Sequence, residues 1–129
     1  MKKTSLFELI GKEPGVEKLV DTFIAEVQNN PEAKSLLALY QSRENTFQHY
    51  RIRMIEFLTG WLGGPLLYTE RHGMPMLKEN HRFIPINAVV TQAWMACMRR
   101  ALSKTIADKT VRLQLEDAFW HLCEHLRNQ

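Results

Sequence analysis

The sequence has few of the residues that mark fibrous, disordered or disulfide-bonded proteins. Its 129 residues include six glycines, five prolines and two cysteines, which excludes a collagen-like or low-complexity chain and a disulfide framework. No stretch approaches the roughly 18 apolar residues that a membrane span needs. Glu8 interrupts the apolar N-terminal stretch before the core of a signal peptide can form. We therefore expect a single cytoplasmic domain over residues 1–129, with both cysteines reduced and no membrane contact.

Strong charge bias and common catalytic motifs are also absent. The formal net charge is only +3, and no block of about five like charges occurs, so we expect no nucleic-acid partner. The stretch GWLGGP lacks the lysine and the preceding strand of a phosphate-binding loop, and neither CxxC nor HExxH is present. His121 and His125 could share a metal ion from one helix face, but no third ligand lies beside them. An exposed pair is the simpler interpretation.

The sequence does have helical periodicity over most of its length. Apolar residues recur at spacings of three and four from residue 16 to residue 27, and again from 47 to 61. Gly-Gly-Pro at residues 63–65 should end the second of these helices, and Asn45 can cap its start. No run of alternating β-branched residues indicates a strand. We therefore predict an all-α fold whose helices cover about residues 14–29, a short stretch ending near 40, 47–61, 88–101 and 111–126.

The segment of residues 66–86 breaks this pattern and carries a histidine in an apolar setting. Its prolines and glycines predict that it is mostly loop, and a loop of this length in a small domain tends to be functional. Leu77, Phe83 and Ile86 flank His81, and Trp94 follows on the next predicted helix. His81 is then either a loop histidine satisfied by backbone hydrogen bonds or the ligand that holds the metal of a large, flat, apolar cofactor.

One combination of motifs in this region resembles a known family. It consists of Gly-Gly-Pro at 63–65, the Tyr-x-x-x-x-Gly-x-Pro-x-Leu stretch that starts at Tyr68, His81, and Trp-x-x-Cys-Met starting at Trp94. Together these motifs make the chain similar to the truncated haemoglobins, and most similar to their bacterial group II type. The similarity extends from LVDTFIAEV to the last helix.

The resemblance implies a truncated globin fold, in which two antiparallel helix pairs pack across one another with haem b (iron protoporphyrin IX) between them. It implies that His81 is the proximal iron ligand and that Trp94 directs its indole N–H toward a bound ligand. Tyr40 stands roughly where the family has an aromatic residue against the haem face.

The remaining pocket residues follow from the same resemblance and from the apolar stripes of the predicted helices. Leu77 and Phe83 would pack against the porphyrin, and Lys78 would lie near a propionate. The other residues that we assign to the cofactor pocket are Phe47, Tyr50, Met54, Ile86 and Met98.

Helix geometry separates two candidates for the distal side. At about 100 degrees per residue, Tyr50 and Met54 face the core or the cofactor, whereas His49 lies about 130 degrees from the middle of that stripe. His49 should therefore point to solvent instead of closing the sixth coordination position. Tyr50 is either a distal hydrogen-bond donor or a core tyrosine with its hydroxyl at the rim. His72 is more simply a loop contact than a competitor for iron.

The sequence also departs from the family pattern. Ile24 stands where the family usually has a tyrosine that donates to the bound ligand, so one distal donor is missing. Asn80 replaces a basic residue near His81, and the early glycine pair is separated into Gly11 and Gly15.

These observations predict a haem protein that binds dioxygen, nitric oxide and carbon monoxide, for oxygen binding or delivery or for nitric oxide handling. The alternative is a redox enzyme, either a nitric oxide dioxygenase or a peroxidase-like protein, that uses an external reductase. No reductase domain is evident in the chain, which favours the binding role. We expect a monomer or a weak homo-oligomer.

Overall fold

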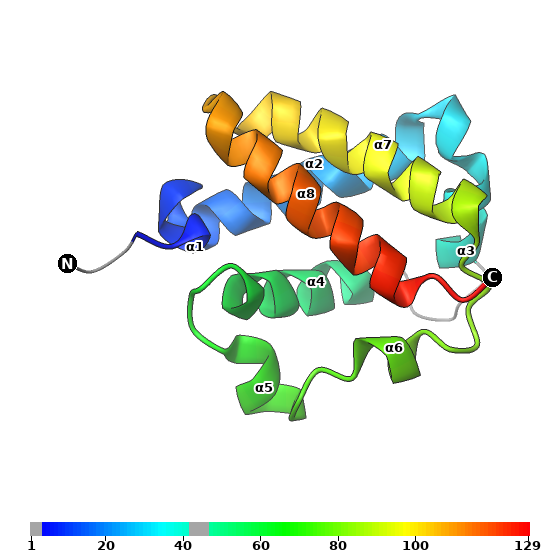
Figure 1. Ribbon diagram of the computed structural model, residues 1–129, viewed down its shortest axis with the longest axis horizontal. Helices are drawn as coiled ribbons and strands as arrows, with labels where there is room; N and C mark the ends of the chain where they lie inside the picture. Colours follow the sequence, from blue (N-terminus) through cyan, green and yellow to red (C-terminus); the bar gives the residue numbers. More distant parts are fainter. Residues whose placement is uncertain (1–3, 42–46) are drawn as a thin grey trace.

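The computed structural model describes residues 4–41 and 47–129, and within these ranges the regular structure is entirely helical (Figure 1). The predicted all-α fold is therefore confirmed. The α-helices are α1 (Leu6–Leu9), α2 (Lys12–Asn29), α3 (Lys34–Gln41), α4 (Phe47–Trp61), α5 (Leu67–His72), α6 (Leu77–Asn80), α7 (Ala88–Thr105) and α8 (Lys109–Leu126), and a 3-10 turn, η1 (Pro31–Ala33), precedes α3.

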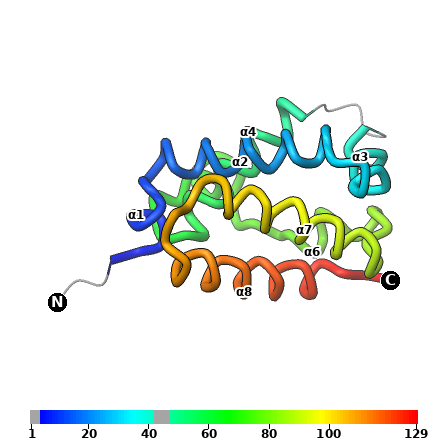
Figure 2. Tube along the Cα trace, turned by 90° about the horizontal axis from the view of Figure 1, so that it is seen from above, coloured from blue at the N-terminus to red at the C-terminus, as the bar shows by residue number. Residues whose placement is uncertain are grey.

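Two antiparallel helix pairs form the body of the domain. Helices α2 and α4 contact each other, as do α7 and α8, and the most extensive packing joins the two pairs through α2 and α7. Figures 1 and 2 show that the members of each pair run in opposite directions, with the α2–α4 pair across the α7–α8 pair. This is the predicted two-over-two arrangement.

The first helices pack closely because of two glycines. The hydroxyl of Ser5 accepts a hydrogen bond from the backbone N–H of Glu8 at 3.2 Å and so caps α1. Gly11 follows with a φ of 105°, a conformation that glycine adopts without strain. A Cβ on Gly15 would lie 1.9 Å from the carbonyl oxygen of Ile10, so only glycine fits there. The separated glycines thus let α1 fold back onto α2.

Helix α2 begins at Lys12, slightly earlier than predicted. Pro14 is tolerated there because the N–H groups of a first turn have no partner within the helix.

The predicted end of α4 at Gly-Gly-Pro is confirmed. Gly63 has a φ of 102°, and a Cβ on Gly64 would lie 2.8 Å from the ring of Phe7. The backbone N–H of Phe7 donates to the carbonyl of Leu62 at 2.9 Å, so α1 is fixed against the end of α4. The predicted cap, Asn45, lies outside the described residues.

The prediction that residues 66–86 are mostly loop is wrong in part. Two short helices, α5 and α6, occupy half of the segment, and His81 directly follows α6. Helices of six and four residues are too short to display the apolar repeat on which the prediction depended. The long segment between α4 and α7 therefore contains two short helices, which residues 73–76 join, and residues 81–87 connect the second of them to α7.

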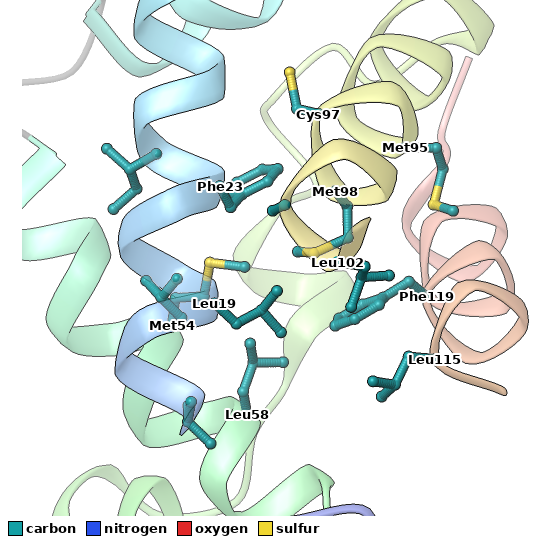
Figure 3. Close-up of a cluster of buried hydrophobic side chains, with 14 of the residues drawn as sticks. Leu19, Phe23, Met54, Leu58, Met95, Cys97, Met98, Leu102, Leu115 and Phe119 are labelled. Atoms are coloured by element: carbon teal, nitrogen blue, oxygen red, sulfur yellow. The ribbon is translucent and has the colours of Figure 1, made fainter. Parts of the chain in front are cut away.

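The core lies where the two helix pairs meet (Figure 3). No helix in the described ranges is long and apolar enough to cross a bilayer. Buried core side chains from all four long helices include Leu19, Phe23, Met54, Leu58, Met95, Met98, Leu102, Leu115 and Phe119.

Candidate functional site

His81 has one ring nitrogen fixed by the backbone. It is half-buried at the C-terminal end of α6, and its Nδ1 lies 2.6 Å from the carbonyl oxygen of Leu77. A carbonyl oxygen can only accept, so Nδ1 carries a proton, and in the neutral ring Nε2 then has the lone pair. This is the hydrogen bond that commonly fixes the tautomer and ring orientation of a metal-binding histidine.

The donor set around His81 fits a haem and not a metal ion held by protein alone. Among the described residues, no three His, Cys, Asp or Glu side chains are placed to share a metal ion. Haem iron is coordinated by the porphyrin and takes an axial ligand such as a histidine. One imidazole with a free Nε2 meets that requirement. His121 and His125 are both exposed, and His121 lies 3.5 Å from Asp117.

Three polar aromatic side chains meet at the junction of α3, α4 and α7. The ring centroids of Tyr40 and Tyr50 are 4.5 Å apart, and Phe47 lies 5.2 Å from Tyr40. The hydroxyls of Tyr40 and Tyr50 are close enough to influence each other's pKa, and the indole of Trp94 acts to lower the pKa of both. The fold thus brings together one residue from each of three helices. The sequence indicated each of them as a pocket residue but not their contact with one another.

The same cluster keeps both tyrosines protonated. Burial raises the pKa of Tyr40 well above its usual value, and the neighbouring Tyr50 adds to the effect. Burial also raises the pKa of Tyr50, although hydrogen bonds from Tyr40 and Trp94 oppose the shift. Both side chains therefore remain neutral hydroxyls, able to donate, throughout the physiological pH range.

Core packing fixes the orientation of Trp94. Its ring centroid lies 5.0 Å from Phe23 of α2 and 5.5 Å from Phe119 of α8. Met54 and Met98, also predicted to line the pocket, are buried in the same core. The indole of Trp94 on α7 is thus held between α2 and α8.

The predicted porphyrin contacts near His81 differ in their exposure. Ile86 is buried and Leu77 is half-buried, whereas Lys78 is exposed. The ring of Phe83 is 83% exposed, with the guanidinium of Arg82 4.5 Å from its centroid. Their contact with a porphyrin stays a prediction.

The two histidines that were considered as rival ligands lie elsewhere. His49 is exposed, as the helical arithmetic predicts. His72, at the end of α5, has its Nε2 3.0 Å from an oxygen of Glu56 and its ring 5.0 Å from Tyr68. Ile24, which replaces the expected tyrosine, is buried beside Phe23 on α2.

Helix α4 also carries a buried carboxylate that the sequence patterns did not predict. Glu56 on α4 is only 4% exposed, and Arg71 lies 2.9 Å from its second oxygen. Burial opposes ionisation, but the hydrogen bonds from Arg71 and His72 outweigh it and lower the pKa of Glu56. The signal in the sequence was a glutamate between two apolar residues of the α4 stripe, with Arg-His at the end of the next short helix, α5.

A family model and a similar curated protein both indicate that the chain is a globin. The family model described as bacterial-like globin matches residues 5–128. The group 2 truncated hemoglobin YjbI of Bacillus subtilis is 33% identical over 123 residues, which cover 95% of this chain and 88% of the relative.

Solved structures agree with this match. The group II 2-on-2 hemoglobin of Agrobacterium tumefaciens has a TM-score of 0.92 at 31% identity, with 100% of this chain and 98% of that chain covered. The truncated oxygen-avid haemoglobin of Bacillus subtilis has a TM-score of 0.83 at 33% identity, with 97% of this chain and 100% of that chain covered.

Proposed function

The chain belongs to the bacterial-like globin family as a group II truncated haemoglobin, and from this we propose that it holds haem b through His81 and binds dioxygen, nitric oxide and carbon monoxide. Membership of the family makes it a haem globin that binds gases. The identity of the haem, the histidine ligand and the individual gases are our proposal.

The observation that carries the proposal is the state of the His81 ring. Its Nδ1–H donates to the carbonyl of Leu77 at 2.6 Å, so in the neutral ring the lone pair is on Nε2. A neutral imidazole in this tautomer can donate its Nε2 lone pair without first losing a proton. His81 would therefore act as the axial ligand of the haem, and its backbone hydrogen bond would set the direction of the ring.

Haem, when bound, supplies an iron atom that binds small diatomic gases reversibly. The chain would supply hydrogen-bond donors and exclude bulk water. Trp94 offers an indole N–H that can only donate, and Tyr40 and Tyr50 offer neutral hydroxyls. These three groups would stabilise partial negative charge on a diatomic ligand, whereas Ile24 offers no donor at the position where the resemblance to the family implies a tyrosine.

Dioxygen is the gas that the comparisons support most directly. One of the similar structures is described as an oxygen-avid haemoglobin, from Bacillus subtilis. A cluster of donors suits dioxygen, since a hydrogen bond to a charged acceptor contributes about 1.5 to 3 kcal/mol, more than one to a neutral acceptor. Carbon monoxide should gain less from the same donors.

Absorption spectra of the purified chain test this function. The wild type should take up one haem per chain and show the ferrous spectrum of a histidine-ligated globin. The substitution His81→Ala should remove that spectrum, and added imidazole should restore it by filling the space of the deleted ring. His72→Ala is the matched control and should leave the spectrum unchanged, since Glu56 engages its Nε2.

Identical spectra for the wild type and His81→Ala would show that another residue binds the iron. Failure of the wild type to retain haem would refute the proposed function as a whole.

A further inference from the structure

The C-terminal end of the chain returns to the segment that carries His81. Figure 1 shows the end of α8 beside the connection that leads into α7. There the Oδ1 of Asn128 accepts from the backbone N–H of Ile86 at 2.9 Å. Its Nδ2 donates to the carbonyl oxygens of Ile84 at 2.8 Å and of His81 at 3.3 Å. One side-chain amide therefore bonds to three backbone groups of a single segment.

This arrangement uses both N–H groups of the asparagine amide and one of the two lone pairs on its oxygen. The two N–H groups face two carbonyls, and the oxygen faces an N–H. The backbone N–H groups of Asn128 and Gln129 add two bonds to the carbonyl of Ile86, at 2.9 and 3.1 Å. An aspartate of the same shape would offer no donor and would set its charge against two carbonyl oxygens. The interaction is thus specific for the amide.

Hydrogen bonds therefore hold both the ring and the backbone of His81. Its ring is fixed from α6 through the bond between Nδ1 and the Leu77 carbonyl, at 2.6 Å. Its own carbonyl accepts from the N–H of Ile84 at 3.0 Å and from Asn128. Because α6 is a single four-residue turn, it cannot define the position of His81 alone. The tail connects this turn to α8, which the buried Phe119 and Cys123 anchor in the core.

We infer that Asn128 is a positioning residue for the haem ligand: its carboxamide fixes the backbone of residues 81–86 so that the Nε2 of His81 stays directed at the iron. The inference depends on the proposed function, because it assigns a role toward the group that His81 would bind. It predicts that the C-terminal tail after α8 takes part in holding the haem through its bonds to residues 81–86.

The experiment compares Asn128→Ala and Asn128→Asp with two controls in the full-length protein. Gln129→Ala keeps the backbone N–H that bonds to Ile86. Val111→Ala removes a buried side chain at the opposite end of α8 and so lowers stability at a distance from the tail. Hydrogen exchange at the Ile86 N–H reports directly on its bond to Asn128, and this measurement needs no haem. The haem dissociation rate and the ferrous iron–histidine stretching band report its effect on His81.

Asn128→Ala removes the side-chain oxygen that accepts from the Ile86 N–H and should make this N–H exchange at least about tenfold faster. Asn128→Asp keeps an acceptor for that N–H and loses the two bonds to the carbonyls of His81 and Ile84, so both variants should loosen the backbone of residues 81–86. They should release haem roughly three to ten times faster and shift the iron–histidine band, since two of the three amide bonds are solvent-exposed and each contributes little. Neither control should change the band.

Two results would overturn the inference. One is a wild-type haem release rate and band position in Asn128→Ala. The other is an equal change in Val111→Ala, which would make the effect one of general stability. Both leave the proposed function intact when the wild type binds haem through His81. A wild type that does not do so refutes the proposed function, and the positioning role with it.

Discussion

At the scale of single residues, Ile24 is where we expect the proposed haem pocket to depart from the truncated haemoglobins. It is 8% exposed and lies next to Phe23 on α2, with an aliphatic side chain where the family usually has a donor. One donor fewer should make dioxygen leave faster. The substitution Ile24→Tyr should therefore slow oxygen dissociation from the haem-loaded protein by roughly tenfold, the effect of one hydrogen bond to a charged acceptor at the lower end of its range. Stopped-flow displacement by carbon monoxide measures the rate.

The control for this substitution is Ile24→Phe, which adds nearly the same ring without a hydroxyl. Overpacking of the core affects both variants alike, so the difference between them isolates the donor. An oxygen dissociation rate in Ile24→Tyr that equals or exceeds that of the wild type would contradict the explanation.

At the scale of secondary-structure elements, Glu56 joins α4 to α5. Its carboxylate lies 2.9 Å from Arg71 and 3.0 Å from His72, both on α5. Glu56→Gln keeps the shape but removes the charge, and it should lower the free energy of unfolding at neutral pH by about 1 to 2 kcal/mol. The effect stays at the low end for a buried ion pair because the Arg71 side chain is 57% exposed and can be solvated when its partner is lost.

The sign of the pH dependence follows from the lowered pKa of Glu56. A carboxyl group whose pKa is lower in the folded state stabilises the protein fully above its unfolded value, about 4.3, and loses that contribution as the pH falls through the folded value. The urea unfolding curves of wild type and Glu56→Gln should therefore differ at pH 7 and converge below about pH 4. Glu70→Gln, an exposed change on α5, is the control. A difference in unfolding free energy between wild type and Glu56→Gln that does not change with pH would exclude the ion pair as its cause.

The long helices that bury one face were predictable from the sequence. The short helices and the buried polar contacts were not. The apolar spacing of α2, α4, α7 and α8 located these helices to within a few residues, because burial of one face every third or fourth position leaves a periodic record. The short helices α5 and α6 leave no such record. Glu56 was also overlooked, because periodicity marks buried positions only when they are apolar.

At the scale of the whole molecule, the candidate site draws on chain segments that are far apart in sequence. Tyr40, Tyr50 and Trp94 meet from three helices, and Asn128 reaches residues 42 to 47 positions earlier in the chain. Sequence patterns identified His81 and Trp94 as candidates through their motif spacing. Such patterns carry no information on a single amide contact between distant segments. The contact of Asn128 with residues 81–86 was therefore visible only in the three-dimensional structure.

This dispersal has a consequence for stability, because a cofactor that binds segments from across the fold binds the folded chain and not the unfolded one. A ligand of that kind at a hundredfold excess over its dissociation constant stabilises the folded state by about 2.7 kcal/mol. For a domain of 129 residues, that corresponds to an increase in the unfolding midpoint of roughly 10 °C. Removing haem from the purified protein should therefore lower the midpoint, measured by circular dichroism at 222 nm, by roughly 10 °C. His81→Ala should show a much smaller difference between its haem-loaded and haem-free forms, since its axial bond is lost, whereas His72→Ala should behave as the wild type. Equal midpoints for wild-type protein with and without haem would mean that the cofactor does not bind across the fold as we propose.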